Sequence, residues 1–273
     1  MRFTSNIAVA VKNSWKRNFP FSAQFYLDLV DELIAKEMSF THEPVDCANC
    51  KKRFTSVFCK VENDTMAEIN DEKICTPYKK GQVIFHEDSR PLGIFCVNRG
   101  KIKLVKTGDD GKEQILRLIK PGDLMGYRAL LSGDKYSASA VVMEEAGICF
   151  IPKDLFMAVL KKDGQLSFEI MKLLSDDLRK AEVSITHFAQ KPVRERLAEA
   201  LLFIKESYGF KPDGKTIDLK ISREELANLV GTATETTIRL LSDLKHEGVV
   251  NLEGKAIEII NLKELVKIAN IED

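Results

Sequence analysis

The sequence lacks both the long apolar runs of a membrane protein and an excess of charge of either sign. No stretch approaches the roughly 18 consecutive apolar residues that a membrane span needs, and the apolar run Ile7–Val11 is too short for a secretory signal. Lys and Arg number 41, as do Asp and Glu, and from Lys191 onward 13 Lys and Arg stand against 15 Asp and Glu. We therefore expect a cytoplasmic protein without a membrane partner, in which any nucleic-acid surface comes from local placement of cations.

The motifs of the common enzyme classes are also missing. The sequence contains no Walker loop and no nucleophile elbow. Its strand-rich region shows no His/His/Glu spacing of a metalloenzyme, and the four histidines do not cluster: His42, His86, His187 and His246. We therefore expect no enzymatic activity and no histidine metal ligand.

The chain has six cysteines, and all of them lie in the first 150 positions: Cys47, Cys50, Cys59, Cys75, Cys96 and Cys149. Because no export signal is visible, metal or redox use is favoured over structural disulfides. The Cys47-x2-Cys50 spacing suits a four-cysteine zinc site, and any low-pKa pair suits a thiol–disulfide sensor. Buried, inert cysteines are the plain alternative. Cys96, inside an apolar strand, is expected in the core.

Residues 66–152 have the pattern of short strands separated by turns. Gly108-Asp109-Asp110-Gly111 is a hairpin loop. Many short strands at regular spacing predict an antiparallel barrel or jelly roll. Residues Lys79–Phe85 are predicted to form a turn and then a strand. The further predicted strands are Leu92–Val97, Lys101–Lys106, Gln114–Ile119, Ser137–Met143 and Gly147–Ile151.

A long helix is predicted over about 154–190, and a second helix over about 193–208 after Pro192. In the long helix apolar residues recur at heptad spacing, and the outer face, which includes Asp176 and Asp177, is charged. A heptad seam favours a partner helix, although packing on the chain's own barrel is the alternative. We predict a dimer interface made by Met171, Leu174, Leu178, Ala181, Ile185 and Phe188.

A helix-turn-helix follows. Ser222 and Glu225 form a capping-box pattern at the start of one helix, and Gly231 permits the tight turn. A second helix covers about 233–247, and residues 249–260 form a β-hairpin wing. The pattern therefore predicts a winged helix-turn-helix.

In such a motif, the N-terminal residues of the second helix meet base edges in the major groove. Arg239 can contact guanine O6 and N7, and Glu235 can accept from cytosine N4. Two alternatives use the same residues within the protein: an ion pair between Glu235 and Arg239, or a capping box between Thr232 and Glu235. The predicted DNA-binding residues are Ser222, Arg223, Thr232, Thr234, Glu235, Thr236 and Arg239.

The string Ser222-Arg223-Glu224-Glu225-Leu226 through Leu241, with Gly126–Leu131 and the long helix, resembles the Crp/Fnr family of bacterial regulators over residues 46–265. The resemblance implies an α+β fold: a cyclic-nucleotide-binding-type antiparallel β-roll, a long dimerisation helix and a C-terminal winged helix-turn-helix. The implied partners are double-stranded DNA with a palindromic site, a second copy of the chain, and RNA polymerase.

The resemblance also bears on the half-site that is read. Glu235 and Arg239 fall where the family places its base readers. The member that reads TTGA-type half-sites carries Glu-x-x-Ser-Arg, and here Ile238 replaces that Ser. Thr234 stands where the cyclic-AMP-responsive member has an Arg. A TTGA-like half-site is therefore expected, with its outer bases open.

The segment that binds cyclic AMP in other members departs from their pattern. Tyr127 replaces the Glu that holds the ribose, and no Arg occurs near Ser137, so Arg128 and Lys135 are the remaining phosphate partners. A cyclic phosphate would be poorly held without a fixed guanidinium. We therefore do not expect cyclic AMP. Another small-molecule effector, or a winged helix that binds protein, stays an alternative.

The cysteines resemble the oxygen-sensing Fnr branch, whose [4Fe-4S] cluster uses three N-terminal cysteines and one from the last strands. The resemblance implies Cys47, Cys50, Cys59 and Cys149 as ligands, with Cys75 as a substitute fourth ligand. One departure is that eight residues separate Cys50 from Cys59, where the Fnr pattern has about five.

These patterns divide the chain into five parts. The N-terminal extension is expected to be disordered or untranslated, because an amphipathic stretch there has little core to pack on and Met38 offers an alternative start. A cysteine-bearing segment, the β-roll sensor, the dimerisation helix and the DNA-binding domain follow. The boundaries are 1–45, 46–65, 66–153, 154–190 and 191–273.

Overall fold

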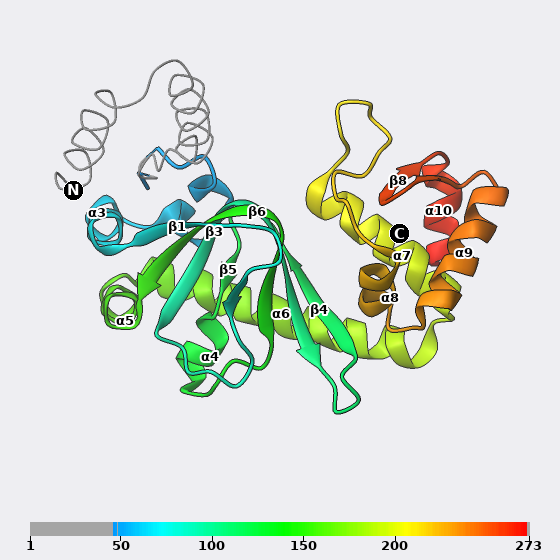
Figure 1. The fold of residues 1–273 in the computed structure, drawn as a ribbon. Coiled ribbons are helices and arrows are strands. Elements are labelled where there is room, and N and C mark those ends of the chain that lie inside the picture. The colour runs from blue at the N-terminus through cyan, green and yellow to red at the C-terminus, as the bar shows by residue number, and fades with distance from the viewer. Residues whose placement is uncertain (1–45, 48, 272–273) are drawn as a thin grey trace, which may run out of the picture. The chain divides into compact units, whose positions relative to one another are not determined.

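The computed structural model describes residues 46–47 and 49–271 (Figure 1). The predictions for residues 1–45 fall outside this part of the chain. The described part begins with two short 3-10 helices, η1 (Arg53–Thr55) and η2 (Val57–Lys60), and a helix α3 (Asn63–Glu72). Helix α3 was not predicted. Its buried side is only Thr65, Met66 and Ile69, too short a stripe to stand out from the strand pattern that follows.

An antiparallel sheet forms the β-roll, with strand order β1-β6-β3-β4; β2 pairs with β6, and β5 pairs with β3. This confirms the predicted antiparallel fold class. The strands are β1 (Ile74–Tyr78), β2 (Val83–Phe85), β3 (Gly93–Thr107), β4 (Glu113–Ile119), β5 (Leu124–Met125) and β6 (Ser139–Pro152).

Strand β3 joins two predicted strands, Leu92–Val97 and Lys101–Lys106, into one. The predicted break between them is wrong because residues 98–100 form a bulge within the strand, with register shifts on both sides of Arg99. Gly100 has φ +92°, and a Cβ there would lie 2.5 Å from the Ala146 backbone, so the close approach of β6 requires glycine. Strand β6 likewise replaces two predicted short strands.

The predicted helix over 154–190 is two helices, α5 (Lys153–Lys162) and α6 (Gly164–Gln190). Asp163 interrupts them with an extended backbone, and its carboxylate accepts the N–H groups of Leu166 (2.9 Å) and Glu62 (3.3 Å). The break therefore caps α6 and anchors the start of α3. A short helix α4 (Tyr127–Ser132) lies between β5 and β6.

The C-terminal part follows the predicted order. Helices α7 (Val193–Tyr208), α8 (Arg223–Val230) and α9 (Thr234–His246) precede a hairpin of β7 (Val250–Glu253) and β8 (Ala256–Ile259). A last helix, α10 (Leu262–Ala269), was not predicted; Asn261 caps it by accepting the Glu264 N–H (3.1 Å).

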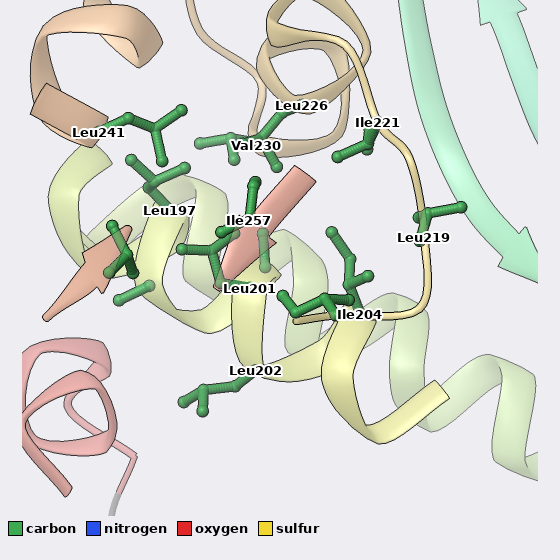
Figure 2. Packing of buried hydrophobic residues seen from close by; sticks show 14 of the residues in the cluster. Leu197, Leu201, Leu202, Ile204, Leu219, Ile221, Leu226, Val230, Leu241 and Ile257 are labelled. Carbon is green, nitrogen blue, oxygen red and sulfur yellow. The ribbon is translucent and has the colours of Figure 1, made fainter. Parts of the chain in front are cut away.

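The core of the C-terminal part lies where α7, α8, α9 and the hairpin meet (Figure 2). Leu197, Leu201 and Leu241 are fully buried there. Ile115 and Leu118 of β4 belong to the same cluster, so this core continues onto the β-roll. None of the helices among the described residues is long and apolar enough to cross a membrane.

Candidate nucleic-acid interface and sensor domain

The turn between α8 and α9 is built as the sequence predicts. The Ser222 hydroxyl accepts the Glu225 N–H (3.1 Å), and the Glu225 carboxylate accepts the Ser222 N–H (2.9 Å), which completes the capping box. Gly231 ends α8 at φ +72°, the left-handed region that favours glycine. The capping box therefore fixes the start of α8, and Gly231 fixes its end before α9.

Glu225 also ties α8 to the β-roll, because its carboxylate lies 3.5 Å from Lys103 Nζ of β3. Burial alone would raise the pKa of Glu225, but the hydrogen bonds from Ser222 and the charge of Lys103 outweigh it and lower the pKa. The cap is thus ionised and fixed at neutral pH.

The Gly231 turn is held against the end of α6. A Cβ at Gly231 would lie 2.6 Å from the Phe188 ring. Arg196 donates to the carbonyls of Gly231 (3.2 Å) and Phe188 (3.1 Å), and its guanidinium lies 5.3 Å from the centre of the Phe188 ring. The long helix therefore positions the turn that orients α9.

The two predicted base readers project from the same side of α9. Glu235 and Arg239 are exposed, whereas Leu241 and Leu244 are buried on the opposite side. Arg239 forms a long ion pair with Asp243 (3.9 Å). Neither alternative use of these residues is present among the described contacts: no ion pair joins Glu235 to Arg239, and α9 begins at N-cap Ala233 without a side-chain cap.

The other predicted DNA-binding residues lie around these two. Thr232, Thr234 and Thr236 are half-buried at the N-terminal end of α9. Ser222 is the helix cap, and Arg223 donates to the Gly254 carbonyl of the wing turn (3.0 Å). Ser222 and Arg223 therefore have structural roles in the protein, and their DNA contacts stay predictions.

The β-roll contains a small pocket at the position of the cyclic-nucleotide segment. Tyr127, Arg128 and Ser137 line it, together with Tyr136 and a residue that sequence reasoning missed, Arg117 of β4. Arg128, one of the two predicted phosphate partners, is exposed. The pocket is therefore lined by an arginine, but from a strand outside the expected segment.

Arg117 is already engaged. Its Nη1 donates to Asp177 Oδ2 of α6 (2.6 Å) and lies 3.2 Å from the Tyr127 hydroxyl, which donates to the same carboxylate oxygen. Burial raises the pKa of Tyr127 to about 12, so it remains a donor. Tyr127 and Arg117 thus link the pocket to the long helix.

The position of Asp177 differs from the predicted one. We expected it on the charged outer face of the long helix, but its side chain is only 5% exposed because it is paired with Arg117. The partners are 60 residues apart, so no local pattern reveals the pair. The outer face is therefore less charged than the sequence suggests.

The predicted dimer residues divide into two groups. Met171, Leu178, Ile185 and Phe188 are between 45% and 68% exposed. Ala181 is also exposed, whereas Leu174 is half-buried and packs on the core beneath α6 and the β-roll. An apolar stripe therefore runs along the outside of α6.

The four predicted cluster ligands are not gathered in one place. Cys149 of β6 forms a disulfide with Cys75 of β1. Cys47 and Cys50 lie beside Cys96, whose pKa burial raises to about 12, with smaller contributions from these two thiols. Among residues 46–47 and 49–271, no group of three or more His, Cys, Asp or Glu side chains is arranged to hold a metal ion. The thiols as placed do not fit a cluster on those four residues.

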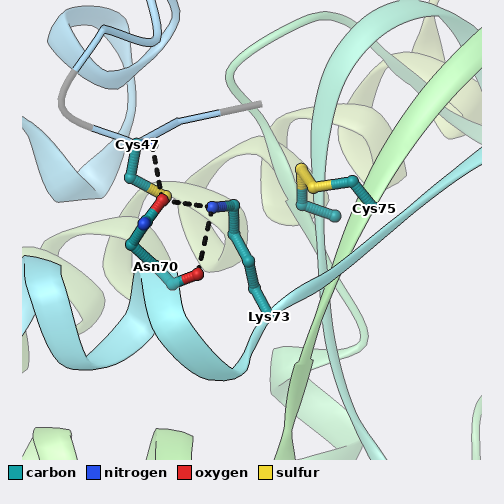
Figure 3. Close-up of a disulfide and its surroundings, with 5 residues drawn as sticks. Cys47, Asn70, Lys73 and Cys75 are labelled. Carbon is teal, nitrogen blue, oxygen red and sulfur yellow. Dashed lines mark hydrogen bonds between the residues drawn. A yellow bond between two sulfur atoms is a disulfide. The ribbon is translucent and has the colours of Figure 1, made fainter. Parts of the chain in front are cut away.

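Cys47 is anchored to α3 (Figure 3). Its N–H donates to Asn70 Oδ1 (2.9 Å), and Lys73 Nζ donates to the same oxygen. Burial raises the pKa of Cys47, and the neighbouring Lys73 charge only partly offsets this. Lys73 lies two residues before Cys75, so Cys47 is close in the fold to the disulfide.

Comparison with known proteins agrees with this architecture. Residues 75–163 match the family described as "Cyclic nucleotide-binding domain", and residues 195–268 match "Crp-like helix-turn-helix domain". A relative in Thermus thermophilus, "Cyclic AMP receptor protein", is 31% identical over 70% of this chain and 86% of its own length. The "Fumarate and nitrate reduction regulatory protein" of Vibrio cholerae is 28% identical over 83% of this chain and 90% of its own length.

The fold is similar to that of solved regulators. A Crp/Fnr-family transcriptional regulator from Thermus thermophilus superimposes with a TM-score of 0.63 at 25% identity, covering 73% of this chain and all of the other. The matched domains stand in the order seen in the fold, with the cyclic-nucleotide-binding domain before the helix-turn-helix. The relatives are regulators of the same kind. This chain belongs to the Crp/Fnr family of DNA-binding transcriptional regulators.

Proposed function

We propose that this protein is a cytoplasmic homodimer that binds a palindromic promoter element with TTGA-like half-sites and acts there with RNA polymerase. The observation that carries the proposal is the exposed pair Glu235 and Arg239 on one side of α9, supported by a turn that fixes the helix. Both side chains can reach base edges once α9 enters a major groove.

The exposed stripe on α6 supports the dimer. An apolar stripe at heptad spacing is stable in water only when a partner covers it. A second copy of the same helix supplies a matching stripe, and a two-fold dimer would present two α9 helices to the two halves of a palindrome. The dimer and the palindrome are thus one proposal.

A gel-shift titration on a TTGA palindrome tests the DNA-binding role. Because the C-terminal part carries no excess of positive charge, affinity must come from a small number of placed contacts. We expect affinity to fall steeply as salt is raised, since each phosphate contact releases counterions. A protein-binding winged helix would give no shift at any salt concentration.

Replacing Arg239 by alanine is expected to weaken binding by about 1–3 kcal/mol and to blur preference at one base pair. The reason is the loss of a two-bond contact to guanine, whereas the buried side of α9 is unchanged. The measurement is a competition gel shift against half-sites varied one base at a time. Lys245→Ala, near the other end of the same helix, is the matched control and should leave the base preference intact. An equal loss on all sequences with Arg239→Ala would contradict base readout.

We further propose that the β-roll responds to oxygen or redox state. Two observations support this. Cys96 lies opposite Cys149 of the Cys75–Cys149 disulfide and beside Cys47 and Cys50. Relatives also have names that describe anaerobic regulation, such as the "Anaerobic regulatory protein" of Aggregatibacter actinomycetemcomitans, 28% identical over 82% of this chain. A [4Fe-4S] cluster on Cys47, Cys50, Cys59 and Cys149 is one candidate for the sensor. It requires the Cys75–Cys149 bond to be reduced and the four thiolates to come together.

Metal analysis of protein purified without oxygen tests the cluster. Iron and sulfide near about four per chain, with broad visible absorption that bleaches in air, would support it. Colourless protein without iron or sulfide would remove the cluster while leaving DNA binding intact, and the cysteines would then act as thiols.

A further inference from the structure

Three cysteines form a row across the β-roll sheet. Cys149 on β6 is directly opposite Cys75 on β1 and, on its other side, directly opposite Cys96 on β3. Directly opposite residues in antiparallel strands project from the same face of the sheet. The three sulfur-bearing side chains therefore lie side by side on one face, with Cys149 in the middle.

The middle position has a chemical consequence. Adjacent strands are about 4.8 Å apart, so Cys75 and Cys96 are separated by roughly twice that distance and each can reach only Cys149. In this structure Cys149 is bonded to Cys75, with a Cα–Cα distance of 4.0 Å, and Cys96 is a thiol. A thiol thus stands beside a disulfide, on the side opposite the leaving sulfur, which is the direction from which a thiolate must attack.

We propose that the row is a thiol–disulfide exchange site, in which Cys149 is bonded to Cys75 in one state and to Cys96 in the other. The Cys96 thiolate attacks Cys149 Sγ, the Cys75–Cys149 bond breaks, and Cys75 leaves as a thiolate that takes up the proton lost by Cys96. One S–S bond forms and one breaks, so the step needs no external oxidant or reductant.

The cysteine-bearing segment covers this site. Cys47 packs on the same hydrophobic cluster as Cys96 and is tied to the end of α3 through Asn70 (Figure 3). With the segment in place, Cys47 and Cys96 are packed together against this cluster, so Cys96 is shielded from solvent. Displacing the segment would expose the row to solvent thiols and disulfides.

Exchange changes which strand is bonded to β6. In the first state a disulfide joins β1 to β6, and β1 in turn holds α3 beside β6. In the second state the disulfide joins β3 to β6, and β1 is held to β6 by hydrogen bonds alone. Cys149 lies four residues before α5, which leads into α6. A change in the bonding of Cys149 can therefore be passed through α5 to helix α6, which carries the apolar stripe. This inference rests on the proposed redox response of the β-roll, not on the DNA contacts.

Differential alkylation and peptide mapping of the full chain test the exchange. The protein is quenched in acid, thiols are blocked with iodoacetamide, and cross-linked tryptic peptides are identified by mass before and after reduction. Wild-type protein should give the Cys75–Cys149 peptide. The Cys75→Ser variant, reoxidised with oxidised glutathione, should instead give a Cys96–Cys149 peptide, with loss of the iodoacetamide adduct on Cys96.

Two further variants keep the test decisive. Cys149→Ser removes the shared partner, so both Cys75 and Cys96 should become fully alkylated. Thr76→Ser, next to Cys75 on β1, leaves all six cysteines in place and is the matched control; it should keep the wild-type map. The proposal is overturned if Cys75→Ser leaves Cys149 as a glutathione adduct with Cys96 alkylated, or if Cys149→Ser joins Cys75 to Cys96.

The same samples are assayed by gel shift on the TTGA palindrome, which separates the two proposals. A Cys96–Cys149 peptide without any DNA shift would support the exchange site and contradict the proposed DNA site. A normal shift with no Cys96–Cys149 peptide in any variant would contradict the exchange site alone.

Discussion

Asp177→Ala is expected to lower the free energy of unfolding by about 3 kcal/mol, the low end of the range for breaking a buried ion pair. Asp177 Oδ2 is the shared acceptor for Arg117 and Tyr127. Without it, a largely buried guanidinium and a buried hydroxyl lose their partner at once. The low end applies because a quarter of the Arg117 side chain is exposed to solvent.

Urea unfolding monitored by circular dichroism measures this effect. Asp176→Ala is the matched control, because Asp176 is the neighbouring residue with the same charge, is 60% exposed, and forms an exposed ion pair with Arg179 at 3.4 Å. Its expected change is below about 0.5 kcal/mol, as for an exposed ion pair. Similar unfolding midpoints for Asp177→Ala and Asp176→Ala would show that the Arg117–Tyr127–Asp177 network does not hold α6 to the β-roll.

Leu178→Asp is expected to dissociate the proposed dimer without unfolding the chain. Leu178 is 62% exposed and lies in the middle of the apolar stripe on α6. Burying a leucine contributes about 2 kcal/mol, and a two-fold interface contains two of them. The loss of about 4 kcal/mol corresponds to roughly a thousandfold increase in the dimer dissociation constant, and the introduced charges add to it.

Light scattering over a range of concentrations measures the mass. The Leu178→Asp variant should have the mass of one chain where the wild type has that of two, with an unchanged circular dichroism spectrum. Thr186→Asp introduces the same charge on the same helix away from the stripe, and it should stay dimeric. An unchanged mass for Leu178→Asp would exclude this stripe as the interface.

Asp177 and Leu178 are neighbours in sequence, yet their expected effects differ completely. A residue step of about 100° on a helix turns one side chain toward the β-roll and the next toward solvent. Heptad spacing predicted the outward position of Leu178 correctly. It wrongly placed Asp177 outward, because periodicity assigns charged residues to the solvent side. Periodicity carries no information about Arg117, the partner of Asp177 on β4.

Local signals alone determined the DNA-binding half of this protein. The Ser222–Glu225 capping box, the glycine turn at Gly231 and the apolar stripe of α9 act over a few residues each, so the sequence predicts them and the structure confirms them. The alternation of strands and turns determined the antiparallel β-roll for the same reason. Both parts depend on backbone geometry and burial within one element or between neighbours.

Only the tertiary structure decided which side chains of the β-roll lie together. The Cys75–Cys149–Cys96 row exists because three strands distant in sequence pair in one register, and a shift of one residue would turn a cysteine to the other face. The Arg117–Asp177 pair likewise joins a strand to a helix 60 residues away. Spacing in the sequence suggests that Cys47, Cys50 and Cys59 lie together. In the structure, strand register and packing instead bring Cys47 and Cys50 beside Cys96. The reason is that contact between distant segments is set by the sheet and not by proximity along the chain.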